Sequence, residues 1–514
     1  MYPGTFAATT PDKAAVVMSD TGAALSYAEL EERSVRLSRV LHAAGLRPGD
    51  DVALLAENGL RSFEVFWAAM RSGLYITAIN QHLTPSEVSY IVNDCGAKAI
   101  VVSSHCAGTA TALLDGTPQV TLRLAYGPDP ADHHDDYETA LAAAPAEPLD
   151  EQPRGRDMLY SSGTTGQPKG VKAPLPGVDV REGGDALLGL FGPLYGFADD
   201  TVYLSPAPLY HAAPLRFGGM IHQVGGTVVV MPRFEPTAAL AAIERYGVTH
   251  SQWVPTMFVR MLKLPEEVRA GYDLSSLRVA VHAAAPCPVE VKRRMIEWWG
   301  PVLQEYYAAT EAIGVTVIDS PTWLEHPGSV GRSLLGVVHV CGEDGADLPT
   351  GEVGLIYFER EVLPFAYHND PGRTASAQHP DHPNWGTTGD VGYLDEDGFL
   401  FLTDRKAFMI ISGGVNIYPQ EVENALTLHP AVLDLAVIGI PDEEMGEQVK
   451  AVVQPAPGVV GSPELERELL AFLRTHLAGY KVPRSIDFVD SLPRTETGKL
   501  QKHRLRDRYL TAAG

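Results

Sequence analysis

The segment Tyr160-Ser-Ser-Gly-Thr-Thr-Gly-Gln-Pro-Lys-Gly170 determines how the rest of the chain is interpreted. Its glycines allow backbone N–H groups to turn towards a ligand. Its hydroxyl groups add donors, Lys169 adds a positive charge, and the segment Asp157–Tyr160 before it predicts a short buried strand. Such a loop is suited to binding phosphate oxygens. It is neither a Walker A loop, because Gly170 follows Lys169, nor a G-x-G-x-x-G fingerprint. A flexible Gly/Ser surface loop is the alternative, but this mixture of residues favours phosphate binding.

Length and composition indicate a large globular protein. The 514 residues predict about three or four compact units at roughly 150 residues each. Hydrophobic residues make up 45% of the chain and charged residues 20%, which is ordinary for a globular protein with a large core. The net charge of −24 argues against nucleic-acid binding, which favours basic surfaces. It does not argue against an anionic nucleotide, because loops and helix ends bind phosphate locally.

Cysteine usage and the absence of export signals predict a cytoplasmic location. The four cysteines form no C-x-x-C pair and are too few for a disulfide framework, so we expect reduced thiols. The N-terminus lacks the basic-then-apolar layout of a signal peptide. No apolar run reaches the roughly 18 residues needed to span a bilayer. The C-terminal Ala-Ala-Gly514 is not a peroxisomal address.

The order of expected elements predicts an α/β fold. Strands at 13–18, 51–55, 75–79 and 99–102 alternate with helices, of which one begins at Ser26 with a capping box completed by Glu29. This alternation predicts a parallel sheet. Residues 126–155, rich in Ala, Pro and Asp, are expected to form a surface connection, and 328–402 a β-rich region. The last hundred residues are predicted to form a small α+β domain. Its expected elements are helices at 420–428 and 463–477, strands at 433–440, 449–453 and 486–489, and a turn at Pro441-Asp442.

The phosphate loop resembles that of the AMP-forming adenylate ligases, which include acyl-CoA synthetases, peptide-synthetase adenylation domains and luciferases. Further segments resemble this family's motifs in the family's order, so the resemblance covers nearly the whole chain. They are Pro206-Ala-Pro-Leu-Tyr-His-Ala-Ala-Pro214, Gln304-Glu-Tyr-Tyr-Ala-Ala-Thr-Glu311, Trp385-Gly-Thr-Thr-Gly-Asp390, the stretch from Asp404 to Glu423, and Pro493-Arg-Thr-Glu-Thr-Gly-Lys499. The resemblance implies a large N-terminal domain (1–403) with parallel sheets and a β-rich subdomain, a hinge (404–407) centred on Ala407, and a small mobile α+β C-terminal domain (408–514).

The resemblance also implies nucleotide and catalytic residues. The ATP and AMP site would be formed by Ser161, Ser162, Gly163, Thr164, Thr165, Gly166, Lys169, Ala283, Ala284, Ala285, Tyr307, Asp390 and Arg405. Of these, Ala283 to Ala285 and Tyr307 would contact adenine, and Asp390 would accept hydrogen bonds from the ribose hydroxyls. Glu311, with Thr164, would bind Mg²⁺, because a hard cation prefers oxygen ligands and neutralises phosphate charge. Thr310 would contact the α-phosphate or acyl oxygen, and Lys499 would stabilise the charge that develops there.

The acyl and CoA sites follow from the same resemblance. The acyl site would contain Tyr210, His211, Trp253, Ala308 and Ala309, and the CoA site Ser412, Gly413, Gly414, Lys481 and Arg484. Trp253 is equally compatible with a core position, and Lys481 and Arg484 with ordinary surface charge. No acidic residue lies between Ser205 and Gln223, where relatives that load amino acids carry an Asp. We therefore do not expect an amino-acid substrate. Because the acyl-site candidates include no charged residue, we expect an apolar carboxylic acid, and the alanines indicate space for a bulky or polycyclic acid rather than acetate.

Three departures from the family pattern keep other functions open. Ala308 and Ala309 follow Tyr307, where the family has Gly directly after the Tyr, and Ala407 replaces the usual Asp or Lys of the hinge. The expected function is an acyl-CoA ligase that uses ATP, Mg²⁺ and coenzyme A. One alternative is a thioesterifying enzyme that takes acyl-AMP from a partner adenylating enzyme. Others are an adenylate enzyme that loads a carrier protein and a nucleotide-binding regulator without turnover. The sequence leaves a homodimer open.

Overall fold

The computed structural model describes residues 1–161, 168–442, 444–494 and 500–512. The chain divides into two compact units, each assembled from several segments. The first contains Met1–Gln252, Ala270–Ala280 and Pro364–Thr374, and the second Trp253–Arg269, Val281–Leu363 and Ala375–Gly514. The predicted small C-terminal domain lies inside the second unit together with the β-rich region, and its boundary at the 404–407 hinge stays a prediction.

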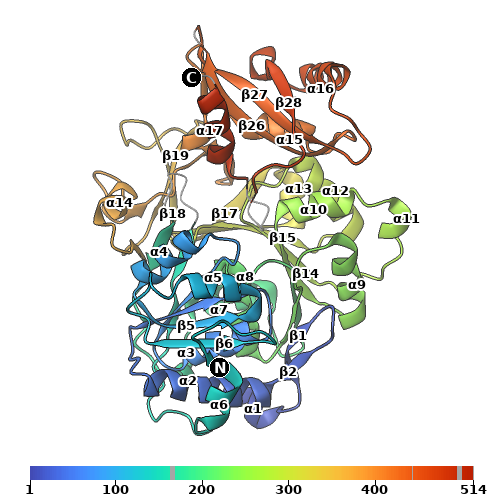
Figure 1. Ribbon diagram of the computed structural model, residues 1–514. Coiled ribbons are helices and arrows are strands. Elements are labelled where there is room, and N and C mark those ends of the chain that lie inside the picture. Colours follow the sequence, from blue (N-terminus) through green and yellow to red (C-terminus); the bar gives the residue numbers. More distant parts are fainter. Residues whose placement is uncertain (162–167, 443, 495–499, 513–514) are drawn as a thin grey trace. The chain divides into compact units, whose positions relative to one another are not determined.

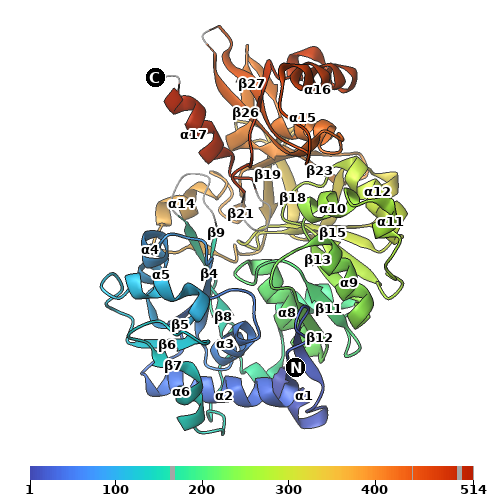
Figure 2. The same ribbon diagram turned by 45° about the vertical axis from the view of Figure 1, so that its right-hand side comes forward.

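A parallel sheet in the order β7-β6-β5-β3-β4-β8 forms one core of the first unit. Its β3 and β5 are buried along almost their whole length, as expected for a sheet covered on both faces. Figure 2 shows β4, β5 and β6 with α3 and α4 beside them. The strands are β3 (Asp51–Leu55), β4 (Tyr75–Ile79), β5 (Ala97–Ser103), β6 (Leu122–Tyr126), β7 (Asp135–Asp136) and β8 (Arg156–Asp157). The helices are α3 (Arg61–Met70), α4 (Pro85–Cys95), α5 (Ala107–Ala112) and α6 (Tyr137–Ala143).

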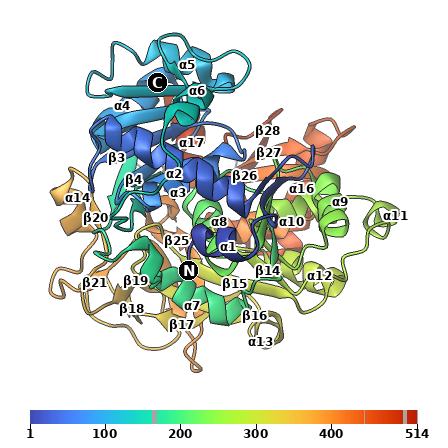
Figure 3. The same cartoon turned by 90° about the horizontal axis from the view of Figure 1, so that it is seen from below.

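A second sheet of the first unit runs β11-β12-β1-β2, parallel except for β2. Its strands are β1 (Ala14–Met18), β2 (Ala24–Ser26), β11 (Val202–Ser205) and β12 (Thr227–Val230), and β13 (His250–Trp253) pairs with β11 through His250 and Ser251. The helices are α1 (Pro3–Thr9), α2 (Tyr27–Ala43), α7 (Ala186–Tyr195), α8 (Ala212–Val224) and α9 (Pro236–Tyr246). In Figure 3, α2 lies beside α3. The alternation of strands and helices therefore gives the predicted parallel α/β architecture.

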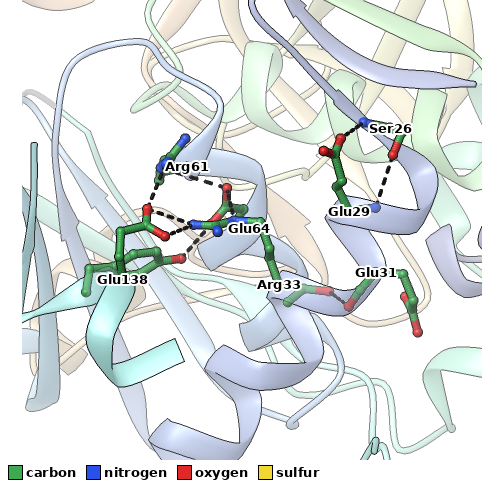
Figure 4. A network of polar contacts seen from close by, with 9 residues as sticks. Ser26, Glu29, Glu31, Arg33, Arg61, Glu64 and Glu138 are labelled. Atoms are coloured by element: carbon green, nitrogen blue, oxygen red, sulfur yellow. Dashed lines mark hydrogen bonds and ion pairs between the residues drawn. The ribbon is translucent and has the colours of Figure 1, made fainter. Parts of the chain in front are cut away.

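The predicted capping box is present at the start of α2. The Ser26 hydroxyl accepts from the Glu29 N–H at 3.2 Å, and the Glu29 carboxylate accepts from the Ser26 N–H at 2.7 Å (Figure 4). This reciprocal pair satisfies two N–H groups that would otherwise lack partners at the start of the helix. A second capping box, Thr84 with Glu87, begins α4.

The sequence predicted a surface connection for residues 126–155. This prediction is wrong for α6, which is part of the packed structure. Tyr137 is fully buried and donates to the buried Glu64 at 2.9 Å. Arg33 lies between Glu64 at 2.8 Å and Glu138 at 2.9 Å, and Arg61 binds Glu138 at 2.7 Å (Figure 4). These contacts fix α6 to α2 and α3. A helix of seven residues is too short to show a clear apolar period in the sequence.

The second unit begins with helices that flank short strands and continues as an antiparallel sheet in the order β18-β19-β22-β23-β17-β16-β15. The helices are α10 (Pro255–Leu262), α11 (Glu266–Arg269), α12 (Val289–Trp299) and α13 (Ser320–Glu325), with β14 (Val279–His282) before α12. The sheet strands are β15 (Leu303–Ala308), β16 (Val315–Asp319), β17 (Ser329–Leu335), β18 (Val337–Cys341), β19 (Gly354–Glu359), β22 (Asp390–Leu394) and β23 (Leu400–Arg405), and β21 (Trp385–Gly386) pairs with β19. The predicted β-rich region from 328 to 402 lies in this sheet, but the sheet begins earlier, with β15 at Leu303.

The C-terminal part of the second unit is the expected small α+β fold. Its sheet runs β25-β24-β27-β26, and β28 adds to β27 in parallel. Figure 1 shows β26, β27 and β28 with α15, α16 and α17 around them. The bounds are β24 (Ile410–Ser412), β25 (Val415–Ile417), α15 (Pro419–Leu426), β26 (Val432–Asp442), β27 (Gly446–Pro455), α16 (Pro463–His476), β28 (Ser485–Phe488) and α17 (Lys502–Ala512). The predicted turn at Pro441-Asp442 is wrong, because both residues pair with β27 and extend β26.

The four cysteines are free, as predicted. Within the described residues, no helix is both long enough and apolar enough to cross a bilayer.

One buried carboxyl gives the first unit a pH-dependent stability. Asp51 begins β3 and is 1% exposed, so its carboxyl group is removed from water. Burial therefore raises the pKa of Asp51 well above its ordinary value. Because the folded state holds this proton more tightly than the unfolded state, its stabilising effect is complete at acidic pH. It is lost as pH rises from about 4 towards the folded-state pKa.

We expect Asp51→Asn to flatten this part of the stability profile and to raise the melting temperature most at the alkaline end. Melting temperatures of both proteins between pH 5 and 9 measure this. Parallel profiles for wild type and variant would show that Asp51 ionises without cost and would contradict the prediction.

Candidate active site

A β-hairpin presents the predicted phosphate loop. β9 (Leu159–Ser161) and β10 (Lys169–Lys172) are antiparallel, with Lys169 opposite Ser161 and Gly170 opposite Tyr160. The predicted single strand at 157–160 is in fact two, because Asp157 pairs with β4 as part of β8 while Leu159 begins β9. The predicted loop residues Ser162, Gly163, Thr164, Thr165 and Gly166 lie outside the described residues. The hairpin brings both ends of their segment together.

Contacts that the sequence did not suggest hold this hairpin. The Tyr160 hydroxyl donates to Asp94 at 2.5 Å, at the end of α4. The segment after β20 (Ala366–Tyr367) also binds Asp94. Asn369 donates to the Asp94 carboxylate at 3.1 Å, and the His368 ring bonds the Asp94 backbone carbonyl at 2.9 Å. β20 also pairs with β10, and the Lys169 ammonium lies 5.2 Å from the centre of the Tyr367 ring. The hairpin is thus fixed on two sides.

Tyr210 and His211 lie in the loop between β11 and α8, and His211 is the N-cap residue of α8. Their ring centres are 4.4 Å apart. Arg216, one turn into α8, forms a bidentate ion pair with Asp157 at 2.7–3.1 Å. This pair connects the helix that follows the predicted acyl loop to the strand that precedes the phosphate hairpin.

The predicted adenine turn contains a strained residue. Ala284 has a φ of +74°, and both Ala284 and Ala285 are exposed, whereas Ala283 is buried. A left-handed backbone is uncommon for residues other than glycine and is concentrated at functional sites. A second such residue, Ala312 (φ +54°), follows Glu311 directly. The Arg360 side chain donates to the Ala312 carbonyl at 3.1 Å and helps to fix that turn. The sequence carries no signal for either conformation.

The second unit brings three predicted nucleotide residues into one cluster. Asp390 is 8% exposed and accepts from the Tyr307 hydroxyl at 2.8 Å and from Arg405 at 3.0 Å. Thr388, which sequence reasoning missed, donates to the same carboxylate at 2.7 Å. Burial and the neighbouring carboxylate raise the pKa of Tyr307 well above its usual value, so the phenol remains a donor. The structure therefore presents a fixed carboxylate that can accept hydrogen bonds from a ligand's hydroxyl groups.

Glu311 follows the cluster's strand and is 8% exposed, while Thr310, Ala308 and Ala309 are half-buried. A largely buried carboxylate is a suitable ligand for Mg²⁺, so Glu311 fits the predicted metal role; the other predicted ligand, Thr164, lies outside the described residues. Bound Mg²⁺ would neutralise phosphate charge.

A buried ion pair that the sequence analysis missed involves α12, the helix that follows the predicted adenine turn. Lys292 in α12 is fully buried and its ammonium is 2.5 Å from the Glu305 carboxylate in β15. His282, the last residue of β14, is 3.6 Å from the same carboxylate. Burial raises the pKa of Glu305 and lowers that of His282, which is therefore neutral. The pair joins α12, which follows Ala283 to Ala285, to the strand that carries Tyr307.

Trp253 is 1% exposed and packs on Trp299 at 5.3 Å and on Phe258 at 6.2 Å. These contacts agree with the interpretation of Trp253 as a core residue. Its role in the acyl site stays a prediction.

The Ser412-Gly413-Gly414 segment forms the turn between β24 and β25. Gly413 and Gly414 have φ of +57° and +80°, and a Cβ on Gly413 would lie 2.4 Å from the Met445 side chain. This left-handed backbone favours glycine at both positions, whereas the flexible end of the Met445 side chain could move aside. Lys481 pairs with Glu421, and Arg484 lies 3.5 Å from Asp442. Both cations thus have acidic partners within the small domain.

The hinge and the C-terminal motif are described in part. Ala407 is exposed in a short 3₁₀ turn, Lys406–Phe408. Lys499 lies outside the described residues, but the two residues that flank its segment, Arg494 and Leu500, form a β-bridge. Arg494 also pairs with Asp434 at 2.5 Å. The base of the predicted catalytic segment is therefore attached to β26.

Comparisons with known proteins agree with this geometry. Residues 5–363 match the family of AMP-binding enzymes, and residues 421–499 match the AMP-binding enzyme C-terminal domain. A solved structure of the anthranilate CoA ligase AuaEII with anthranoyl-AMP superposes with a TM-score of 0.86 at 25% identity, covering 100% of this chain and 97% of that one. The fold is thus that of an adenylate-forming ligase. The chain belongs to the family of AMP-binding enzymes.

Similar proteins with assigned names indicate which kind of AMP-binding enzyme this chain is. A feruloyl-CoA synthase from Amycolatopsis is 38% identical over 95% of this chain and 94% of its own length. The 3-[(3aS,4S,7aS)-7a-methyl-1,5-dioxo-octahydro-1H-inden-4-yl]propanoyl:CoA ligase of Rhodococcus jostii is 33% identical, with 95% of both chains covered. The protein is therefore an AMP-forming acid–thiol ligase that uses ATP, Mg²⁺ and coenzyme A, as the sequence predicted. The alternative functions are not favoured by these relatives.

Thr388 provides a test of the Asp390 cluster. We expect Thr388→Val to raise the KM for ATP at least about tenfold, because the loss of one hydrogen bond to a charged group costs about 1.5 kcal/mol or more. Thr388→Ser keeps the hydroxyl and should restore the wild-type value. The measurement is steady-state pyrophosphate release at saturating acid. Equal KM values for all three proteins would show that Asp390 does not depend on Thr388.

Proposed function

We propose that this ligase activates an apolar, bulky carboxylic acid that contains a ring system, aromatic or polycyclic. The observation that carries the proposal is the loop around Tyr210 and His211, which places two adjacent rings at the predicted acyl site without an acidic residue in that stretch. The names of the two relatives, which concern a phenylpropenoic acid and a fused-ring propanoic acid, support the same choice. Ala308 and Ala309, which the sequence also predicts for the acyl site, are half-buried.

In the proposed first step, a carboxylate oxygen attacks the α-phosphorus of ATP, and the bond to pyrophosphate breaks. Asp390 holds the ribose hydroxyls, and Ala283 to Ala285 with Tyr307 accept the adenine ring. Lys499 and the phosphate loop stabilise the negative charge that develops on the phosphate, as fixed donors do in other transferase sites. Glu311 is the metal-binding carboxylate.

In the proposed second step, the sulfur of CoA attacks the acyl carbonyl, and the bond to AMP breaks. Rotation of the small domain about Ala407 would withdraw Lys499 and bring the Ser412-Gly413-Gly414 turn to the acyl-adenylate. The two glycines leave room for a narrow pantetheine chain. Lys481 and Arg484 would release their acidic partners to bind CoA phosphates.

The first experiment incubates the purified protein with Mg-ATP, CoA and one acid at a time, from ferulate, fused-ring propanoates and fatty acids. We expect acyl-CoA and AMP in equal amounts, with the highest kcat/KM for a ring-containing acid. Mass spectrometry follows both products. A fatty acid that exceeds every ring-containing acid would contradict the proposed substrate class.

Lys499→Ala is the companion variant in the same assay. It should abolish pyrophosphate release but keep thioester formation from synthetic acyl-AMP and CoA. If wild-type protein behaves like this variant, Ala308 and Ala309 mark a lost first step, and the enzyme depends on acyl-AMP supplied by another enzyme.

His211 tests the acyl site. We expect His211→Ala to change the ratio of kcat/KM between ferulate and a fused-ring acid by about tenfold, the effect of altering one apolar contact of a pocket. The KM for ATP should stay within twofold of wild type. An equal loss for every acid would remove His211 from the acyl site.

A further inference from the structure

The loop that carries Tyr210 and His211 lies between β11 and α8, outside both elements. Proline at 206 and 208 removes two backbone donors, and residues 206–211 take part in no sheet ladder. Yet Ala207 and Leu209 are 5% and 3% exposed. A buried loop needs partners for its polar backbone groups, since each one left unpaired costs free energy. The contacts that satisfy these groups therefore decide where the loop lies.

The Asn58 side chain supplies hydrogen-bond partners for the backbone of this loop. Its side-chain N–H₂ group donates to the Ala207 carbonyl at 3.2 Å, and its oxygen accepts from the Leu209 N–H at 2.8 Å. The same N–H₂ group donates to the Met231 carbonyl at 2.9 Å, just after β12. Asn58 is 8% exposed, so water competes little for these bonds. One amide thus binds the loop on both sides of Pro208 and attaches it to the adjacent strand.

The position of Asn58 gives these bonds a larger role. It follows β3, a strand of the β7-to-β8 sheet, whereas its partners follow β11 and β12 of the other sheet. The bonds therefore connect the carboxyl ends of strands from both parallel sheets of the first unit. Ligands of open α/β folds bind at this end of the strands.

We propose that Asn58 is a positioning residue for the acyl-binding loop, and that it sets acid affinity and preference by holding the backbone of residues 207–209. The inference rests on the proposed role of Tyr210 and His211. Asn58 itself is not predicted to touch the acid. A side chain that only stabilised the fold would instead lower the amount of active protein and leave the KM of each substrate unchanged.

Asn58→Asp is the sharpest variant, because it keeps the size and the acceptor for Leu209 but removes both donated bonds. It also places carboxylate oxygen against two carbonyl oxygens. We expect the KM for the preferred acid to rise about tenfold, as the loss of two hydrogen bonds implies, and the ranking of acids to change. The KM for ATP should stay within twofold. Asn58→Ser, which leaves a small polar group, is the second variant if the first yields too little folded protein.

Tyr27→Phe is the matched control. Tyr27 is fully buried in the same unit, and its hydroxyl donates to the Gly226 carbonyl at 2.7 Å, before the start of β12. The control therefore loses a buried bond at the opposite end of that strand. It should lower the melting temperature without changing the KM for any acid.

A double-variant cycle completes the test. If Asn58 acts through the loop, Asn58→Asp should add little to the acid KM of His211→Ala, because coupled residues are not additive. Independent effects that multiply would overturn the inference, as would the same kinetic pattern in Asn58→Asp and Tyr27→Phe. If His211→Ala alone leaves acid KM unchanged, the proposed acyl site fails instead. If His211→Ala raises acid KM and Asn58→Asp does not, only the role of Asn58 fails.

Discussion

The Asp390 carboxylate is the contact on which the predicted nucleotide site depends. It receives hydrogen bonds from Tyr307 on β15, from Thr388, which precedes its own strand, and from Arg405 at the end of β23. Strands β22 and β15 are separated in the sheet by β23, β17 and β16, so one buried carboxylate fixes distant strands relative to each other. Donors and acceptor are thus in place before a ligand binds. Such preorganisation avoids the free-energy cost of rearrangement during the reaction.

Sequence reasoning predicted those parts of the molecule that depend on local pattern. The alternation of strands and helices gave the parallel sheet, and the capping box at Ser26 and Glu29 gave the start of α2. The order of the motifs indicated the nucleotide cluster, because Tyr307, Asp390 and Arg405 do lie together. The roles of individual residues in catalysis, and the domain boundary, remain predictions that geometry alone does not test.

Several contacts could not be predicted because nothing in the local sequence marks the side chains that make them. Asn58 binds Ala207, Leu209 and Met231 far along the chain, and Glu305 binds Lys292 from a different element. Thr388 resembles many other threonines in its surroundings. A polar residue in a loop carries no sequence period that would reveal its partner. The left-handed Ala284 and Ala312 are hidden for another reason, because alanine is a residue from which that conformation is not expected.

Residues 364–374 belong to the first unit although they follow much of the second unit in sequence, and this affects how the first unit folds during synthesis. β10 pairs with β20, so the pairing of Val171 with Tyr367 cannot form until Tyr367 has been synthesised. The same holds for the hydrogen bonds of Asp94 with His368 and Asn369. Contacts between such distant residues form late and slow the folding of a domain. During synthesis, domains generally fold from the N-terminus onwards. In this protein the edge of β10 stays open until the ribosome has translated more than two-thirds of the chain, and an open strand edge is a place where newly made chains associate wrongly.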